Sequence, residues 1–453
     1  MTARRFRLSP ARVLTLGFLS VVLLGAVLLS LPVAANDPAH PVDFFDAMFT
    51  STSAVCVTGL TVVNTGLTFS LFGKIVLLFL IQVGGLGFMT VAAVLFMAIG
   101  KHISLKERLI LQESLSSDSL SGLSNLVRQA ITVTFITEAI GAALLCIRLI
   151  PLHDIGNGIF YSVFLSVSAF CNAGFDPFGF DCSIVPYGQD ALIGIVLMAL
   201  VVIGGIGFAV VIELLRPKKK NGLSLHTRIV VVVSAVLLIL GTGVFLLTEW
   251  NNPQTLGAEG LSFGDKLLMA AFQSVTVRTA GFDAIGQGAL TSASVLFGMI
   301  LMFIGASPAS TGGGIKTTTL FVAIATVWAV VRQREDYTVG KRRLSTQQAR
   351  KALAILLMAL AVVLVDTFLI CVIQSAVSEP LPLPDVLYEV VSACATVGLS
   401  TGITASLAPI SRLLLIVTMF MGRVGLLTVT VALSGDPHKN NALRYPEERI
   451  LVG

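Results

Sequence analysis

Charged residues are scarce in this chain. Asp, Glu, Lys and Arg make up only 12% of its 453 residues, whereas about a quarter of an ordinary soluble domain is charged. Hydrophobic residues make up 55%. Apolar runs of about 20 residues recur along the chain, and each is long enough to cross the hydrocarbon core of a bilayer. The sequence therefore predicts a membrane protein with several spans, not two or three soluble domains.

Sequence patterns typical of metal sites and cofactor sites are also missing. The six cysteines show no metal-ligand spacing, and most lie in apolar segments, so we expect small buried hydrophobic residues there. We expect no zinc motif, no Gly-x-Ser-x-Gly motif and no paired intramembrane aspartates in this chain, and therefore no enzyme. No strand–Gly-x-Gly-x-x-Gly–helix unit is present, and Gly312–Lys316 does not have the glycine and lysine adjacent, as a phosphate loop does. Regulation by a nucleotide would therefore need a partner protein.

The few basic residues are unevenly placed. Most of the 30 Lys and Arg residues lie in five places, and these alternate with segments that carry Asp and Glu instead. This alternation is the positive-inside pattern of membrane proteins, so the net charge of +5 does not indicate nucleic-acid binding. It predicts that both termini are cytoplasmic and that the number of spans is even. The basic places are the tail up to Arg12, 101–128, 216–228, 332–351 and 439–449; the acidic segments are 36–46, 151–158, 249–265 and 378–389.

Four short segments with a central glycine repeat along the chain, and the glycines are 115, 107 and 117 residues apart. A near-constant period across so hydrophobic a chain indicates a fourfold internal repeat. The three residues that end on each of these glycines are called the glycine turns below. They are Val57, Thr58 and Gly59; Asn172, Ala173 and Gly174; Thr279, Ala280 and Gly281; and Thr396, Val397 and Gly398.

Each repeat is predicted to contain a spanning helix, a short half-helix, a glycine turn and a second spanning helix. The half-helix at 43–57 would be about 22 Å long, too short for a core of ~30 Å, so it enters and leaves on one side. The fold class is therefore an all-α membrane protein of four helix–pore-loop–helix repeats around a central pore, with eight spanning helices and four re-entrant half-helices. The repeats are placed at 1–100, 101–216, 217–335 and 336–453. The helices are placed at 12–33, 43–57 and 71–99; 127–150, 158–172 and 190–215; 228–249, 263–278 and 291–331; and 350–377, 384–396 and 411–433.

The glycine turns suit cation binding by backbone carbonyl groups. Oxygen ligands must replace the water around a cation, and glycine adopts at little cost the backbone angles that aim carbonyls at one axis. The half-helices point their partly negative C-terminal ends at the same place. Asp176 and Asp283 would then lie at the outer mouth. Ser53, Ser168 and Ser392 each stand six residues before their glycine, and Val275 breaks this pattern in the third repeat.

The second helix of the third repeat is interrupted, which makes this segment a candidate gate. Proline and three glycines oppose a helix there, and the side chains are small or carry hydroxyls. We expect its carbonyls and hydroxyls to bond to Arg423, a charge inside an apolar run of the fourth repeat, and to form a movable barrier below the glycine turns. The candidate gate residues are Gly305, Ala306, Ser307, Pro308, Ala309, Ser310, Thr311, Gly312, Gly313, Gly314, Lys316 and Arg423.

Other intramembrane polar residues have structural interpretations. Lys316 could instead extend to the lipid headgroups. Glu138 and Asp366 are expected to make contacts between helices, with ion binding as the alternative. Arg278 is expected to donate to neighbouring carbonyls. The second helices of repeats one and two carry the small-residue segments 84–87 and 204–207, which we interpret as close helix packing.

Taken together, the glycine turns, the Gly305–Lys316 segment and the Gly-Arg423-Val-Gly segment resemble the Trk/Ktr/HKT superfamily of potassium transporters over nearly the whole chain. The similarity is strongest to the Ktr-type pore-forming membrane subunit, down to His226-Thr227-Arg228 and Arg444-Tyr445-Pro446. The resemblance implies K+ uptake across the cell inner membrane, often linked to Na+, with no cofactor in this chain. It also implies a homodimer in the lipid membrane and a cytoplasmic ring of nucleotide-binding, RCK/KTN-type regulatory subunits. In some plant members of this superfamily a serine replaces the first of these glycines and is associated with Na+ selectivity. Because this chain has Gly59 at that position, the resemblance implies that K+ is favoured over Na+.

Two other functions remain open from the sequence. One is a secondary transporter with inverted repeats and a midplane site, although all four half-helices face the side poor in basic residues. The other is a cation transporter that also admits Na+, because the residues beside the four glycines differ from one another.

Overall fold

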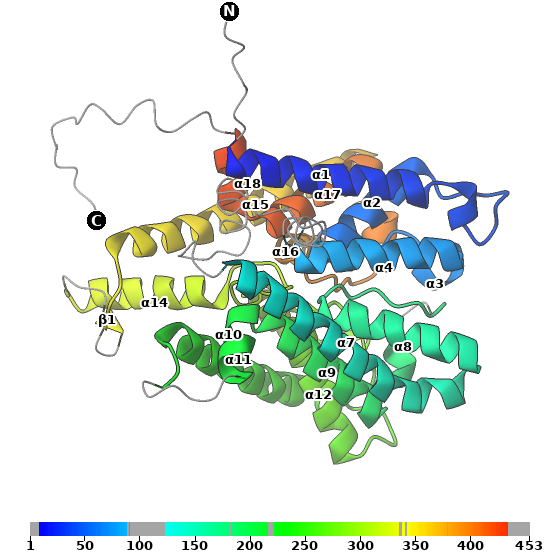
Figure 1. The fold of residues 1–453 in the computed structure, drawn as a ribbon, viewed down its shortest axis with the longest axis horizontal. Helices are drawn as coiled ribbons and strands as arrows, with labels where there is room; N and C mark the ends of the chain where they lie inside the picture. The colour runs from blue at the N-terminus through cyan, green and yellow to red at the C-terminus, as the bar shows by residue number, and fades with distance from the viewer. Residues whose placement is uncertain are drawn as a thin grey trace, which may run out of the picture.

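The computed structural model describes residues 9–87, 90, 123–180, 183–215, 222–334, 338–339, 342–377 and 379–433. These residues are helical apart from turns, connections and one small hairpin, which pairs β1 (Thr338–Val339) with β2 (Arg342–Arg343). Several helices run in roughly the same direction, as α1, α4 and α8 do in Figure 1, while α7 is inclined to them. The tail residues 439–449, with Arg444-Tyr445-Pro446, lie outside the described residues, as do residues 101–122 and 216–221 of the basic loops.

The predicted order of elements recurs in all four repeats. Short 3-10 turns, η1 (Pro32–Ala34), η2 (Val185–Tyr187), η3 (Gln287–Ala289) and η4 (Thr404–Ser406), lie in the connections. The first repeat holds α1 (Pro10–Leu29), the half-helix α2 (Phe44–Val55), the single turn α3 (Thr65–Thr68) and α4 (Leu71–Leu86). The second holds α7 (Leu123–Leu152), the half-helix α8 (Ile155–Phe170), α9 (Ala191–Gly205) and α10 (Phe208–Leu215). The third holds α11 (Leu225–Glu249), the half-helix α12 (Phe263–Thr276), α13 (Ser292–Phe303) and α14 (Thr317–Val331). The fourth holds α15 (Thr346–Val377), the half-helix α16 (Leu383–Ala395), α17 (Pro409–Val424) and α18 (Leu426–Leu433).

Three of the half-helices begin at a side-chain cap. Asp43 accepts a hydrogen bond from the amide of Phe45 at 2.9 Å, and Asp154 accepts one from the amide of Asn157 at 3.3 Å. In α12, Ser262 and Asp265 bond each other's backbone amides in a capping box. These caps satisfy donors that the first helical turn leaves free, so the start of these three half-helices is fixed by local sequence.

Each of the first three half-helices is bonded to the long helix before it. A buried serine donates to a carbonyl of that helix, and a glycine beside it leaves no space for a Cβ. This repeated contact sets the half-helix against its own long helix, and the fourth repeat lacks the serine. The pairs are Ser51 with Val22 O (2.7 Å) beside Gly25, Ser166 with Glu138 O (2.7 Å) beside Gly141, and Ser274 with Leu238 O (2.8 Å) beside Gly241.

Four described helices are long and apolar enough to cross a membrane: α1, α11, α15 and residues 125–152 of α7. Two bent pairs raise the number to as many as six among the described residues. The remaining predicted spans are 71–99, most of whose second half lies outside the described residues, and 291–331. The last is interrupted between α13 and α14, as the sequence predicted.

Two predicted second helices are not continuous, so that part of the prediction was wrong. The range 190–215 bends by 103° between α9 and α10, and 411–433 bends by 102° between α17 and α18. Gly207 at φ +99° and Gly425 at φ +97° lie at the breaks, and Gly87 at φ +82° ends α4. Because both ranges are mostly apolar, hydrophobicity carried no signal of the break. Each break lies at a glycine, Gly207 or Gly425, but a glycine also fits close helix packing.

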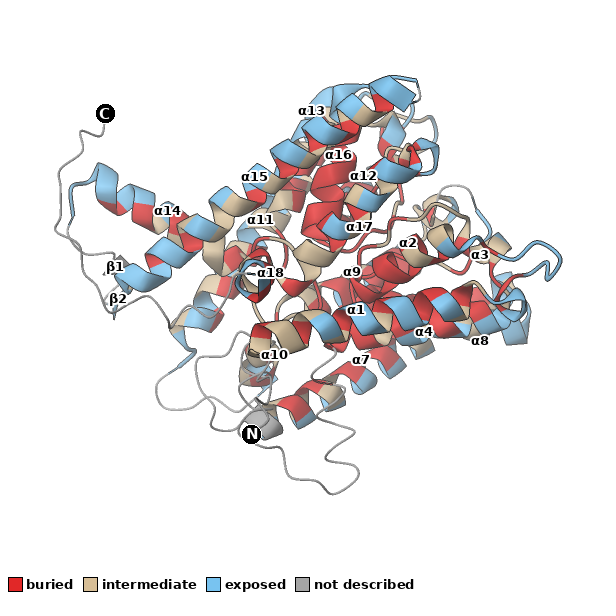
Figure 2. Cartoon of the chain, turned by 90° about the horizontal axis from the view of Figure 1, so that it is seen from above, coloured by how far each residue is buried: buried red, intermediate tan, exposed pale blue. Residues whose placement is uncertain are grey.

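The outer faces of the long helices are apolar. Ile239, Leu247 and Phe368 are 74, 80 and 66% exposed, as expected for side chains that face lipid. Figure 2 shows buried residues gathered on the half-helices and on α9, with exposed residues along α1 and α15. The polar backbone of the half-helix ends is thus enclosed by protein.

Candidate functional site

The four glycine turns share one backbone geometry. Each central glycine has a positive φ: +94° at Gly59, +68° at Gly174, +81° at Gly281 and +93° at Gly398. The residue two positions earlier also has a positive φ in every repeat, although none of these four is glycine. Non-glycine residues rarely take this conformation, so four at matched positions indicate a constraint common to all repeats. They are Val57 (56°), Asn172 (59°), Thr279 (71°) and Thr396 (52°).

The four turns meet in a closed ring. A Cβ placed on any of the four glycines would come closer than 3.0 Å to a backbone carbonyl oxygen of the next turn. Adding a side chain would therefore break the ring, which explains the glycine in each repeat. The pairs run around the ring in order: Gly59 against Ala173 O, Gly174 against Ala280 O, Gly281 against Val397 O, and Gly398 against Thr58 O.

The amide groups of the turns bond back to their own half-helices. The amides of Thr58, Ala173 and Val397 each donate to a carbonyl of the preceding half-helix at 2.8 Å. The twelve carbonyl oxygens of the glycine turns accept no hydrogen bond from any described residue. Buried carbonyls are almost always bonded, so a ring of free ones, enclosed by protein, is suited to a cation ligand.

A hydroxyl group supports every turn, including the third, where the sequence showed no serine at the expected place. Ser53 and Ser392 accept from the amides of Gly59 and Gly398, both at 3.0 Å. Ser168 instead donates to Phe175 O at 2.7 Å. In the third repeat Thr276 donates to Phe282 O, also at 2.7 Å.

In the third repeat, the backbone hydrogen bond from the turn to its half-helix spans one residue fewer than in the others. This explains why Thr276 takes the place of a serine. The amide just before the glycine, that of Ala280, donates to Thr276 O at 3.0 Å. In the other three turns the matching amide donates to the serine that stands six residues before the glycine. Thr276 stands only five residues before Gly281, so backbone bond and supporting hydroxyl move together by one residue.

The 305–314 loop lies directly against one side of the ring. The amides of Ser307 and Thr311 donate to Gly205 O and Gly204 O at 3.0 and 3.2 Å. A Cβ on Gly312 or Gly313 would overlap the hydroxyl of Thr279 or Thr396, respectively. The loop is therefore held by α9 on one side and touches the glycine turns on the other.

Both intramembrane cations bond to backbone carbonyls around this loop. Arg423 donates to Thr311 O and to the carbonyls of Gly84 and Gly85. Lys316 donates to Gly312 O at 2.6 Å and does not extend away from the loop. A carbonyl of the loop accepts from Arg423 as expected, but the hydroxyl groups of the loop bond to other partners. Arg423 thus connects the loop to the end of α4.

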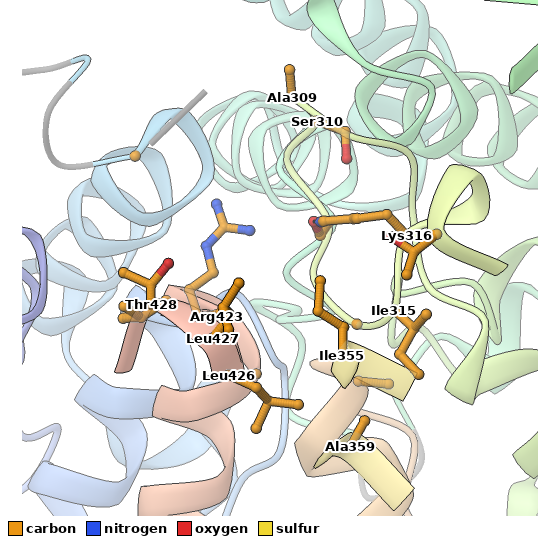
Figure 3. Close-up of a pocket in the computed structure, with 18 of the residues that line it drawn as sticks. Ala309, Ser310, Ile315, Lys316, Ile355, Ala359, Arg423, Leu426, Leu427 and Thr428 are labelled. Atoms are coloured by element: carbon orange, nitrogen blue, oxygen red, sulfur yellow. The ribbon is translucent and has the colours of Figure 1, made fainter. Parts of the chain in front are cut away.

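A cavity of about 650 Å³ opens beside the loop. Its lining includes the helix breaks at Gly87 and Gly425 together with Ser310, Lys316 and Arg423. Figure 3 shows the side chains of Lys316 and Arg423 on opposite sides of this space, with Ile355 and Leu426 farther along it. Phe208, the first residue of α10, lines the same cavity. All four helix breaks therefore border one internal space on the side of the ring where the 305–314 loop lies.

The other polar residues singled out in the sequence act between helices. Glu138 bonds to Gln82 of α4 at 3.4 Å, and Asp366 accepts from Thr418 of α17. Arg278 makes only long contacts with Ser234, at 3.4 and 3.5 Å. The contacts of Glu138 and Asp366 agree with their structural interpretations. Arg278 reaches only one carbonyl, Ser234 O, and its buried Nε has no partner among the described residues, so its expected role as a donor to neighbouring carbonyls is met only in part.

The two aspartates expected at the outer mouth also bond to the backbone of their own connections. Asp283 accepts from the amides of Ile285, Gly286 and Gln287 at 2.8 to 3.1 Å. Asp176 accepts from the amide of Phe178 at 3.2 Å. The carboxylate of Asp283 therefore fixes the backbone that follows its turn. It does not lie free as a charge at the mouth.

The expectation that the chain has no Gly-x-Ser-x-Gly motif was wrong. Gly398-Leu399-Ser400-Thr401-Gly402 fits the Gly-x-Ser-x-Gly pattern of serine hydrolases. Here it follows a half-helix instead of a strand, and Ser400 donates to the buried carboxylate of Glu389. Glu389 also accepts from Thr404 at 3.2 Å, so it fixes the chain beyond the fourth turn. No group of His, Cys, Asp and Glu among the described residues is arranged to hold a metal ion.

Comparison with known proteins agrees with this architecture. The profile of the TrkH family, described as a cation transport protein, matches residues 24–442. The chain is 37% identical over 447 residues to the Ktr system potassium uptake protein B of Bacillus subtilis, covering 99% of this chain and 97% of that one. It is 34% identical over 450 residues to the potassium/sodium uptake protein NtpJ of Enterococcus hirae, covering 99 and 98%.

The fold is also similar to a solved structure. The crystal structure of the potassium transporter TrkH from Vibrio parahaemolyticus superposes with a TM-score of 0.68 at 19% identity, over 93% of this chain and 85% of that one. This chain belongs to the TrkH cation transport family, and it is a multi-pass membrane protein, not an enzyme. The predicted family and fold class are confirmed.

Proposed function

Starting from membership of the TrkH cation transport family, we propose that this protein takes up K+ across the cell inner membrane through the ring of glycine turns. The observation that carries the proposal is the set of twelve free carbonyl oxygens at the ring. Four chain segments supply these oxygens at equivalent positions, as a dehydrated cation requires. The half-helix ends add negative potential at the same place. The relatives named for potassium uptake match nearly the whole chain.

The 305–314 loop is the proposed gate, and Lys316 and Arg423 hold it by donating hydrogen bonds to its carbonyls. The contacts of the loop with Thr279 and Thr396 support this role, because a chain segment in that position obstructs the path of an ion leaving the ring. Apart from the two cations, only backbone hydrogen bonds and a few hydroxyls hold the loop. It can therefore leave without breaking a hydrophobic core.

The assembly around the pore is proposed from the resemblance. It comprises a homodimer of this chain, both termini in the cytoplasm, and a ring of nucleotide-binding regulatory subunits on the basic inner face. The four repeats, 1–100, 101–216, 217–335 and 336–453, are its structural units. Coupling to Na+ is part of the proposal.

A weaker preference for K+ over Na+ is the second candidate. The residue before the glycine is Thr58, Ala173, Ala280 or Val397, so the walls of the ring are not identical. The Enterococcus hirae relative, named for both ions, also supports this alternative.

Uptake of K+ by a strain that lacks its own K+ uptake systems tests the function, measured with and without external Na+. We expect the chain to restore growth at low K+, and Gly281→Ser to remove that uptake. A Gly281→Ser variant that reaches the membrane and transports K+ normally would refute the assigned pore. Uptake that is identical with and without Na+ would refute the Na+ link alone. Cysteine accessibility at 157–158 and 263–265 distinguishes four parallel repeats, with both sites outside, from inverted repeats.

A further inference from the structure

Thr311 of the 305–314 loop has its amide, its hydroxyl and its carbonyl all bonded to residues outside the loop. It is fully buried, and its amide donates to Gly204 O at 3.2 Å. Its hydroxyl donates to Phe170 O at 3.0 Å, and its carbonyl accepts from Arg423. One residue therefore joins the loop to α9, to the end of half-helix α8 and to α17.

Asn172 meets the same hydroxyl from the side of the ring. Its side-chain amide lies 3.3 Å from the hydroxyl of Thr311 and 3.1 Å from that of Thr279, and both contacts hold in either orientation of the amide. One side chain of the second turn thus contacts both the third turn and the loop. The matching residues in the other turns, Val57, Thr279 and Thr396, carry no side-chain amide.

The backbone conformation of Asn172 makes this contact sensitive to the shape of the turn. Its φ of +59° is one that asparagine tolerates better than most residues. The side chain of a residue in this conformation moves with the carbonyls on either side of it. A change in the second turn therefore shifts the partner of Thr311, and a shift of the loop removes a bond that holds Asn172.

We propose that Asn172 and Thr311 form a latch that makes the position of the 305–314 loop and the ion preference of the ring depend on each other. Loop withdrawal breaks the Thr311 contact and leaves the Asn172 amide with Thr279 and with carbonyls outside the loop, such as Phe170 O and Val201 O at 3.3 Å. The second turn then loses its only side-chain contact with the gate loop among the described residues. Because coupling is reciprocal, an ion that fits the ring better also changes how firmly the loop is held. The inference rests on the proposed function, in which the ring conducts and the loop gates.

A double-mutant cycle in the full-length chain tests the latch. Thr311→Val keeps the size and the backbone bonds of Thr311 but removes the hydroxyl, and Asn172→Ala removes the amide. Each variant, and the pair, is reconstituted in liposomes, and K+ and Na+ fluxes are measured separately. We expect each single change to raise K+ flux and to lower the K+/Na+ flux ratio by roughly 3- to 10-fold, in line with the loss of one hydrogen bond. The double variant should be no more altered than the stronger single one.

Two further variants keep the result interpretable. Thr326→Val removes a buried hydroxyl that bonds only within α14, to Val322 O at 2.8 Å, and should change neither flux nor ratio. Thr311→Ser retains the hydroxyl and should preserve the selectivity that Thr311→Val loses, which separates the missing bond from a folding defect.

The outcomes distinguish the latch from the function on which it rests. Additive effects in the cycle, or a raised K+ flux with an unchanged K+/Na+ ratio, overturn the latch. Deletion of residues 306–314 provides the separate arm. If that deletion leaves flux unchanged, the loop is not a gate and the proposed function fails at that point. If the deletion raises flux while the two single variants remain additive, only the latch fails.

Discussion

The four repeats are nearly equivalent at the glycine turns and plainly different at the breaks in their second helices. Around the ring, both positive-φ positions recur in every repeat, and each glycine meets the carbonyl of the next turn. On the side of the ring where the 305–314 loop lies, α4 ends at Gly87 and α9 bends into α10. The third repeat inserts the 305–314 loop, and α17 bends into α18 beside Arg423.

The difference follows from the proposed roles of the two regions, the ring of glycine turns and the helix breaks. One cation at the axis must contact all four repeats at once, so any departure in one turn is felt by the whole ring. A barrier needs only one segment that fills the path and a partner that holds it. Symmetry is therefore associated with the proposed selectivity and asymmetry with the proposed gating.

Breaking the ring should have the largest effect. Gly398→Ala places a Cβ against Thr58 O and also imposes a positive φ on alanine, which alone costs about 1–2 kcal/mol. We expect K+ uptake to fall by roughly 100-fold, because the overlap with backbone adds to that cost. Gly402→Ala is the matched control, since Gly402 has φ +99° but an added Cβ would meet nothing within 4 Å. An equal loss in both variants would mean that backbone strain, not ring closure, is what matters.

Releasing the loop should have the next largest effect, in the opposite direction. Arg423→Gln removes charged donors to Thr311 and Gly84, and such bonds are worth about 1.5–3 kcal/mol. We expect K+ flux without any partner protein to rise by about 10-fold. Arg412→Gln is the comparison. Arg412 also bonds a carbonyl, Leu407 O at 2.9 Å, but pairs with Asp46 instead of the loop. A similar rise in both variants would argue against a specific role for Arg423.

The hydroxyl that supports the third turn allows a finer test of equivalence. Thr276→Val removes the bond to Phe282 O and should reduce K+ uptake by about 5-fold, the value of one buried hydrogen bond. Ser168→Ala, which removes the matching bond to Phe175 O, should have a similar effect. Adding Val275→Ser to Thr276→Val should not restore uptake, because that position is one residue out of register. Restoration would show that the third repeat follows the spacing of the others.

A change far from both the ring and the helix breaks should have the smallest effect. Arg148 pairs with Asp190 at 2.5 Å, but the arginine side chain is 53% exposed. Exposed ion pairs contribute about 0–1 kcal/mol. Arg148→Ala should leave K+ uptake unchanged and lower the thermal midpoint in detergent by only a few degrees. A loss of uptake here would show that the outer connections influence the ring.

The sequence predicted the half-helices to within a few residues, because their short length, their caps and the glycine after each are local signals. Family and fold class followed from the same segments. The bends at Gly207 and Gly425 were missed, because the apolar pattern continues through both. Small residues that permit close packing also permit a break, and only the surrounding structure decides between the two.

The support of the third turn was missed for a related reason. Val275 occupies the place of the serine in a fixed spacing, but the third turn bonds back to Thr276 instead, one residue nearer its glycine. The positive φ of Val57, Thr279 and Thr396 could not be predicted either, since these residue types normally avoid it. It arises from closure of the ring, which involves all four repeats at once.

The most direct test of the central assignment is to locate the ion. A crystal structure of the full-length protein prepared with Tl+ in place of K+ would show the cation by its anomalous scattering. We predict a peak on the axis of the ring, bounded by the carbonyl oxygens of the four glycine turns, and its loss in Gly398→Ala. A Tl+ peak elsewhere in the membrane region, with none at the ring, would contradict the account.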